Sequence, residues 1–184
     1  GFDCGPGNAL MDHWCERHTG QPYDASGAWA AQGQVLPALL DALLAEPYLQ
    51  QPPPKSTGRD LFHPAWLTGH LQRHPGAASV DVQATLTEFT ARSAALSVLE
   101  HGRDAAQLAV CGGGARNTHL MQRLTALLPG VQVAPTDDHG LPAQQVEAAA
   151  FAWLARQTLH GLPGNLPQVT GAHGPRVLGA VYPA

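Results

Sequence analysis

Several features are scarce in this sequence, and each shortage excludes a class of protein. Only 13% of the 184 residues are charged and the formal net charge is −4, so no basic surface indicates a nucleic-acid partner. No run of about 18 apolar residues is present, so we predict no membrane-spanning helix and no membrane partner. The start of the chain lacks the charged and apolar regions of a signal peptide.

Cysteine is also sparse. Three cysteines without a C-x-x-C pair are typical of a reducing cytoplasm rather than of a disulfide framework. His70 and His74 form the best local pair among ten histidines, but no Cys or carboxylate cluster completes a ligand set beside them. We therefore predict a cytoplasmic protein with no metal-ligating residues.

The composition favours a chain with a sizeable core. Hydrophobic residues make up 44% of the sequence, and 184 residues suit one domain or one lobe of a larger enzyme. The chain begins without Met and inside a motif, so we expect a fragment of a longer protein.

Apolar periodicity predicts helices that alternate with short strands. The predicted helices are 9–18, 64–72, 81–100, 118–128 and 144–160, and 35–45 is apolar at helical spacing. The predicted strands are 107–111, 131–134 and a closing strand at 177–182. Strand, glycine turn, helix and strand over 107–134 indicate one parallel unit, so the fold class is α/β and helix-rich.

Capping and core residues follow from the same pattern. We predict Asn8 as the N-cap of the first helix, and Ser79 or Asp81 as the cap of the longest one. One apolar face of the longest helix is predicted to join the core, from Val82, Leu86 and Phe89 to Leu96 and Leu99. In the last helix, core positions are favoured over a ligand platform for Phe151, Trp153 and Leu154.

Two glycine-rich turns carry candidate chemistry. Asp3 lies in a Gly- and Pro-dense turn over 1–8, where a carboxylate can activate a nucleophile, bind Mg²⁺ indirectly or accept turn hydrogen bonds, and from the motif alone the last is favoured. Gly112, Gly113 and Gly114 follow a strand and precede a helix, which suits a phosphate cradle or only a tight turn. Asn117 can cap that helix or touch a nucleotide, and capping is favoured.

Two further places offer polar side chains. Lys55, Ser56, Thr57 and Arg59 combine cations and hydroxyls behind a proline run, which suits phosphate oxygens or a solvated loop. Glu147 stands early in an apolar helix, where a carboxylate either stabilises the helix N-terminus or accepts from sugar hydroxyls.

Taken together, these strings resemble the C-terminal half of the anhydro-N-acetylmuramic acid kinase family. The matching segments follow the family order over nearly the whole chain: 1–3, 5–8, 22–24, 54–59, 111–117, 147–148, 150–155, 164–167 and 169–172. The resemblance implies a ribonuclease-H-like lobe of the actin/hexokinase-like kinase superfold. Residues 1–184 would form the second lobe, and the N-terminal lobe with its first phosphate loop would lie outside this chain.

The resemblance also implies an activity. Family members use ATP, with Mg²⁺, and water to convert 1,6-anhydro-N-acetylmuramic acid into N-acetylmuramic acid 6-phosphate during peptidoglycan recycling in the cytoplasm, and they form homodimers. The family's general base falls on Asp3. Gly112, Gly113, Gly114 and Asn117 fall on the nucleotide side and Glu147 near the amino sugar. Lys55, Ser56, Thr57 and Arg59 are assigned to phosphate or interlobe contacts.

The sequence departs from the family pattern at two places. Cys4 stands where Thr or Ser is expected, and Gln144 with Gln145 replaces acidic residues before Glu147. Two alternatives stay open: a non-catalytic sugar- or nucleotide-binding lobe, and a hexokinase-like kinase of another substrate. On the favoured interpretation, this chain alone is expected to be inactive because half of the phosphate-binding machinery lies elsewhere.

Overall fold

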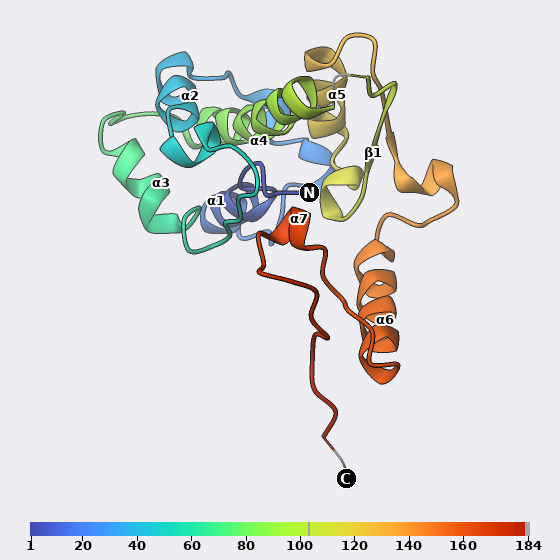
Figure 1. The fold of residues 1–184 in the computed structure, drawn as a ribbon. Helices are drawn as coiled ribbons and strands as arrows, with labels where there is room; N and C mark the ends of the chain where they lie inside the picture. The colour runs from blue at the N-terminus through green and yellow to red at the C-terminus, as the bar shows by residue number, and fades with distance from the viewer. Residues whose placement is uncertain (103, 183–184) are drawn as a thin grey trace.

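The longest predicted helix lies at the centre of the observed architecture. In the computed structural model, which describes residues 1–102 and 104–182, helix α4 spans Ser79–His101 and packs against α1, α2 and α5 (Figure 1). The other α-helices are α1 Ala9–Thr19, α2 Pro37–Leu44, α3 Pro64–Leu71, α5 Thr118–Leu127, α6 Val146–Leu159 and α7 Pro167–Thr170. The strands are β1 Gln107–Val110 and β2 Gln132–Pro135. Short 3₁₀ turns are η1 Ala25–Gly27, η2 Ala30–Gln32, η3 Pro47–Gln50, η4 Gly113–Arg116 and η5 Thr136–His139.

The core forms where α4 meets the surrounding helices. Its members are mostly large apolar side chains: Leu10, Met11, Trp14, Leu39, Leu40, Leu43, Tyr48, Phe62, Leu67, Val82, Leu86, Phe89, Ala91, Leu120 and Leu124. Phe89 is completely buried, with the rings of Phe62 and Trp66 each 6.1 Å from its own. This burial is the main stabilising contribution to the fold.

Polar groups of α4 are also buried, and several of them link α4 to neighbouring elements by hydrogen bonds, although the Oε1 atom of the buried Gln83 has no partner among the described residues. The Thr85 hydroxyl accepts from the Leu36 amide at 2.9 Å, and Thr90 donates to the Gly7 carbonyl at 2.9 Å. Glu88 accepts from Arg92 at 2.8 Å and from Arg123 of α5 at 2.7 Å. These pairings lower the desolvation cost of polar groups in the interior.

The predicted strand–turn–helix–strand unit is confirmed. β1 and β2 pair in parallel, with Gln107 opposite Gln132 and Val110 opposite Pro135, and α5 connects them. Together with the helices this gives a helix-rich α/β fold, as expected.

Several predictions about the longest helix were wrong in detail. Leu96 and Leu99 are each 55% exposed, because the buried stretch of α4 ends at Ala95. Ala78, not Ser79, occupies the N-cap position, and the Asp81 carboxylate instead accepts from the Gln34 amide at 2.7 Å.

The predicted cap of the first helix was right in position but not in its hydrogen bonding. Asn8 occupies the N-cap position of α1, but its side chain makes no capping hydrogen bond. Its amide instead points to the turn at Gly113, as described below.

The predictions for the C-terminal segment were wrong as well. Phe151 and Trp153 are 63% and 50% exposed, because α6 stands apart from the helical body (Figure 1). Only Leu154 is half-buried, close to Gly164 and Leu178. Residues 177–182 form no strand, since no strand in the described part of the chain lies beside them to pair with.

Across residues 1–102 and 104–182, none of the helices combines the length and the apolar character needed to cross a bilayer.

Candidate active site

The Asp3 carboxylate is exposed at the N-terminal turn and is held by a distant loop. Its Oδ2 atom accepts from the Ser56 hydroxyl at 2.8 Å and from the Thr57 amide at 3.0 Å. The main chain of Asp3 donates to the Lys55 carbonyl at 3.4 Å. The structure thus brings the predicted base together with three of the four loop residues that we singled out.

Tyr48 fixes the same turn from the side of the core. Its hydroxyl donates to the Asp3 carbonyl at 2.8 Å, and its ring packs against Phe62. Burial raises the pKa of Tyr48, and the charge of Asp3 raises it further. The phenol therefore keeps its proton and remains a donor at neutral pH.

Helix α4 supports the rest of the N-terminal turn. A Cβ atom on Gly5 would lie 2.3 Å from the Ser93 hydroxyl, so no side chain fits between the turn and α4. Thr90 holds the Gly7 carbonyl. The close approach of the turn to α4 explains why position 5 is a glycine. It also fixes the positions of Asp3 and Asn8 on either side of Gly5.

The second glycine turn differs from the prediction in one respect. The glycines do not lead directly into α5, because the 3₁₀ turn η4 intervenes between Gly112 and Asn117. Gly112 has φ +75° and ψ −166°, a backbone conformation that requires glycine. The Asn117 side chain accepts from the Leu120 amide at 2.9 Å, which confirms it as the N-cap of α5.

Asn8 connects the two turns. A Cβ atom on Gly113 would lie 3.1 Å from the Asn8 amide nitrogen, and one on Gly114 would lie 3.4 Å from the Asn8 amide oxygen. Thus the turn that carries Asp3 ends against the triple-glycine turn, although their sequence positions are about a hundred residues apart.

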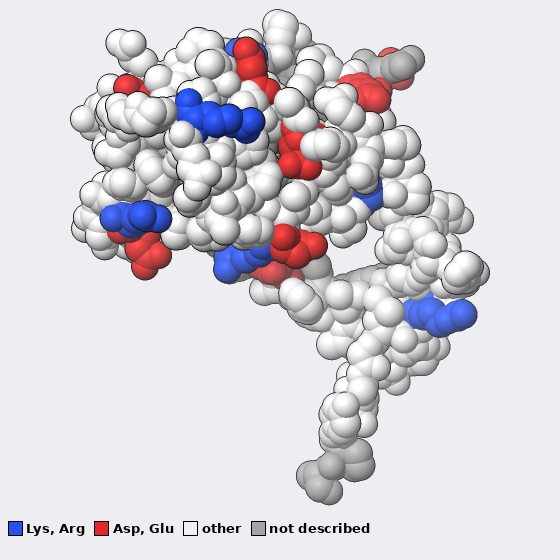
Figure 2. All heavy atoms as spheres, turned by 90° about the vertical axis from the view of Figure 1, so that its left-hand side faces the viewer, with Lys and Arg blue, Asp and Glu red and all other residues white. Residues whose placement is uncertain are grey.

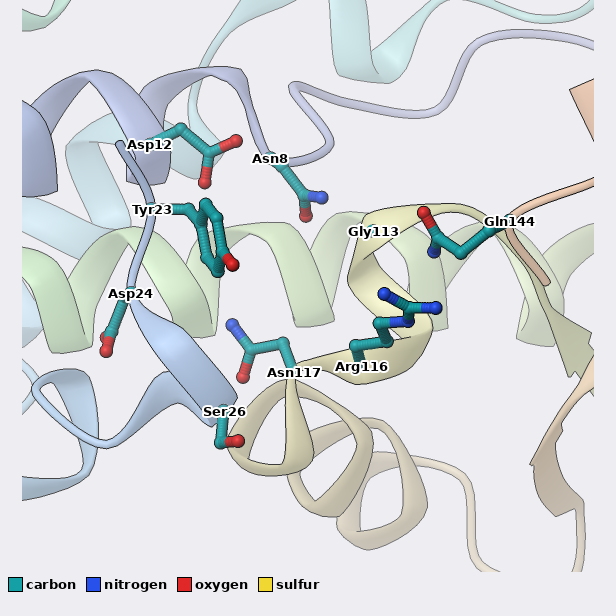
Figure 3. A pocket seen from close by; sticks show the side chains of 9 residues that line it. All are labelled: Asn8, Asp12, Tyr23, Asp24, Ser26, Gly113, Arg116, Asn117 and Gln144. Atoms are coloured by element: carbon teal, nitrogen blue, oxygen red, sulfur yellow. The ribbon is translucent and has the colours of Figure 1, made fainter. Parts of the chain in front are cut away.

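A cavity of about 260 Å³ lies beside this junction (Figure 3). Its lining comes from four parts of the chain: Asn8, Asp12, Tyr23, Asp24, Ser26, Gly113, Arg116, Asn117 and Gln144. Figure 3 shows Arg116 and Gln144 on the side of the glycine turn and Tyr23 on the opposite side. Asp3 does not line this cavity. The turn that carries Asp3 continues through Gly5 to Asn8, and Asn8 lines the cavity.

Two carboxylates of this cavity have different surroundings. Both oxygens of Asp24 are used, one by the Trp29 amide and one by the Ala30 amide, each at 2.9 Å, so Asp24 is structural. Burial raises the pKa of Asp12. The Arg59 guanidinium lowers this pKa in part, and the negative charge of Asp24 raises it further. Asp12 also lines, together with Arg59, a neighbouring hollow next to α3.

Lys55 and Glu147 lie apart from this cavity. The Lys55 ammonium donates to the carbonyls of Tyr48 and Leu49 at 3.3 and 3.0 Å, and lies 5.6 Å from the centre of the Phe2 ring. Glu147 is exposed in the first turn of α6, three residues after Gln144, which does line the cavity. Its contact with sugar stays a prediction.

Sequence reasoning missed most of the cavity lining. Asn8 stood in a matching string but was given a role only as a cap, Gln144 was treated only as a departure from a pattern, and Asp12 and Ser26 were not singled out. Tyr23 stood in a matching string, but without a role. A hydrogen bond from the Gly112 amide to the Ala143 carbonyl, at 2.8 Å, places Gln144 beside the turn, and no local pattern reveals it.

Residues 1–102 and 104–182 contain no group of three or more His, Cys, Asp or Glu side chains arranged to hold a metal ion.

Comparison with known proteins assigns relatives to this chain. A family model described as anhydro-N-acetylmuramic acid kinase matches residues 1–184. A protein of that name from Variovorax paradoxus is 66% identical over 184 residues, which are 100% of this chain and 49% of the relative. Proteins of the same name from Cupriavidus pinatubonensis and Albidiferax ferrireducens are 60% and 61% identical; the chain is covered completely and the relatives to 49% and 47%. The chain therefore spans about half the length of the curated relatives it matches.

Proposed function

Because the chain belongs to the anhydro-N-acetylmuramic acid kinase family, we propose that it forms the C-terminal lobe of an ATP-dependent sugar kinase. The whole enzyme would hydrolyse and phosphorylate 1,6-anhydro-N-acetylmuramic acid to N-acetylmuramic acid 6-phosphate, in peptidoglycan recycling. We place it in the cytoplasm as a homodimer, and its lobe in the ribonuclease-H-like, actin/hexokinase-like superfold. The identity of 66% to a protein of this name favours this substrate over that of another hexokinase-like kinase.

The observation that carries the proposal is the position of Asp3. The exposed Asp3 carboxylate is held through one of its oxygens. Five residues further along the same turn, Asn8 lies against the glycine turn beside the cavity. A base and a nucleotide-binding turn on one connected surface are what a sugar kinase needs from its second lobe.

Asp3 would act on water. No residue in the described part of the chain donates a hydrogen bond to its Oδ1 atom, so that oxygen can accept a proton from solvent. As the water oxygen bonds to the anhydro carbon, its proton moves to Asp3, and the bond from that carbon to O6 breaks with its electron pair on O6. Asp3 then returns the proton to solvent, which restores the carboxylate.

The glycine turn fits a nucleotide. Gly112 adopts a conformation open only to glycine, Gly113 leaves its main chain uncovered at the cavity, and Arg116 with Asn117 lines the same space. Backbone amides in such a turn suit phosphate or ribose oxygens. When bound, ATP supplies the phosphoryl group that ends on O6. Mg²⁺ is usually held by one or two carboxylates and the phosphates themselves, and we assign it no ligand in this chain.

The C-terminal segment supports the assignment to one lobe of two. Helix α6 buries no residue, and we assign its exposed apolar side chains Phe151 and Trp153 to contact with the remaining half of a longer protein. Figure 2 shows few charged side chains over the projecting segment. We therefore expect the chain by itself to bind nucleotide weakly and to catalyse no turnover.

The test is Asp3→Asn in the protein that carries both lobes. We expect ADP release to fall by about 10³-fold or more, because general-base catalysis and the attack of water are both lost. ATP binding, measured by calorimetry, should stay unchanged. Asp41→Asn on the exposed side of α2 is the matched control and should keep full turnover.

Retained turnover in the Asp3→Asn protein would refute the assignment of the base. Release of ADP with glucose or glycerol, but not with 1,6-anhydro-N-acetylmuramic acid, would instead refute the substrate.

A further inference from the structure

The contacts of Asp3 are distributed unevenly between its two carboxylate oxygens. Ser56 Oγ and the Thr57 amide both donate to Oδ2, at 2.8 and 3.0 Å. Oδ1 receives no hydrogen bond from residues 1–102 or 104–182. Two donors on one oxygen fix the torsion angles of the side chain and so fix where the other oxygen lies.

The loop that supplies these donors is itself tied to the turn. Lys55 donates through its ammonium to the carbonyls of Tyr48 and Leu49, and its own carbonyl accepts from the Asp3 amide. The Tyr48 hydroxyl also holds the turn, because it donates to the Asp3 carbonyl. Main chain and side chain of Asp3 are therefore both held by the segment 48–57.

The hydrogen-bond donors of Ser56 and Thr57 decide between two roles for this loop, which are to hold the Asp3 carboxylate or to hold a phosphate oxygen. A hydroxyl has a single proton, and that of Ser56 is directed to Asp3, so it is not available to a phosphate oxygen. The Thr57 amide is engaged in the same way. With both donors occupied, this loop is poorly suited to hold a phosphate and well suited to hold a carboxylate.

We propose that Ser56 and the Thr57 amide are positioning groups that orient Asp3 so that Oδ1 receives the proton of the attacking water. This inference rests on the proposed function, because it takes Asp3 as the base. The water proton goes to Oδ1, while Ser56 and Thr57 keep their own protons throughout. Lys55 and Tyr48 keep the positioning loop in place.

The experiment compares Ser56→Ala with Ser56→Thr in the protein that carries both lobes. We expect kcat to fall by about 10- to 100-fold in Ser56→Ala, the effect of one hydrogen bond to a charged group. KM for the sugar and for ATP should change by less than about threefold, since Oδ2 touches neither in this proposal. Ser56→Thr, which restores the hydroxyl, should recover kcat to within about fivefold of the original protein.

Thr125→Ala is the matched control for loss of an exposed hydroxyl. Within the described residues, the Thr125 hydroxyl bonds only to the Met121 carbonyl of its own helix, so the kcat and melting temperature of Thr125→Ala should match those of the unmodified protein. Melting temperatures of the Ser56 variants should lie within about 2 °C of the original, because the residue is exposed.

Each outcome separates this inference from the proposed function. Turnover retained in Asp3→Asn overturns both. An inactive Asp3→Asn protein with unchanged kcat in Ser56→Ala overturns the positioning role alone. A raised KM for ATP at constant kcat in Ser56→Ala also overturns it, because that result marks a phosphate contact. No recovery in Ser56→Thr, with a lowered melting temperature, reduces Ser56 to a structural residue and overturns it too.

Discussion

Helix α4 is largely buried although it is rich in polar residues, whereas helix α6 is exposed although it is mostly apolar. α6 has the larger share of apolar residues, yet none of its residues is buried, whereas α4 buries polar residues such as Thr85 and Glu88 along with Phe89. The difference lies in what surrounds them: α4 is packed against α1, α2 and α5, and α6 packs mainly on the tail that follows it. Apolar content therefore predicts burial only where a neighbouring element supplies the other face.

The tail that follows α6 is ordered by its own hydrogen bonds. The Asn165 side chain accepts from the Arg176 amide and donates to the Gly174 carbonyl at 3.2 Å, and the Gly164 amide donates to the Arg176 carbonyl at 2.9 Å. The Thr158 hydroxyl contacts the Leu178 carbonyl. This segment therefore has a defined path without a core, and its apolar surface remains available for a partner.

The largest expected effect is in the α4 core. Phe89→Ala should lower the free energy of unfolding of this chain by about 4 kcal/mol, because it removes a fully buried ring and leaves a cavity beside Phe62 and Trp66. Urea unfolding followed by fluorescence measures it. A decrease in the free energy of unfolding below about 1 kcal/mol would contradict the difference in packing between α4 and α6, since Phe89 would then contribute no more than an exposed ring.

A smaller effect is expected where α4 meets α5. Burial raises the pKa of Glu88, but hydrogen bonds from Arg123 and Arg92 outweigh it, so the pKa of Glu88 falls below its ordinary value of 4.5. A carboxylate whose pKa is lower in the folded state than in the unfolded state stabilises the fold at pH values above its unfolded-state pKa. This contribution is lost as the pH falls through its folded-state pKa.

Glu88→Gln should therefore cost about 2 kcal/mol at neutral pH, and the difference from the original chain should shrink below a pH of about 4. Urea unfolding at neutral pH and at a pH of about 3 measures this. Glu100→Gln, at the exposed end of the same helix, is the control and should have no measurable effect at either pH. A pH-independent loss in Glu88→Gln would show that packing, not the ion pairs, stabilises this junction.

The sequence was informative where a local rule decides the structure. The strands around the glycine turn, the cap at Asn117 and the long helix over 79–101 follow from periodicity, glycine and a side chain that bonds three residues ahead. The same rules were wrong for Phe151 and Trp153, because a helical apolar face does not specify its partner.

The site shows the same limit. Asp3 was predicted as the base and the loop 55–59 as a phosphate or interlobe contact, but the direct contact between them was not predicted. Ser56 lies 53 residues from Asp3 in the sequence, and a single exposed hydroxyl carries no pattern that specifies a distant acceptor. The same holds for Asn8 and Gln144, which reach the cavity through tertiary packing.

The smallest expected effect is in α6, and it depends on what the chain is joined to. Phe151→Ala is the same substitution as Phe89→Ala, but its ring is 63% exposed, so in this chain the free energy of unfolding should change by less than about 0.5 kcal/mol. In the two-lobe protein that we propose, the same substitution should cost about 2 kcal/mol or more if the other lobe covers α6, because the ring would then be buried. Equal, negligible effects in both proteins would mean that the exposed face of α6 is not the contact between lobes. The pair of measurements thus tests whether α6 differs from α4 by its sequence or only by the absence of its partner.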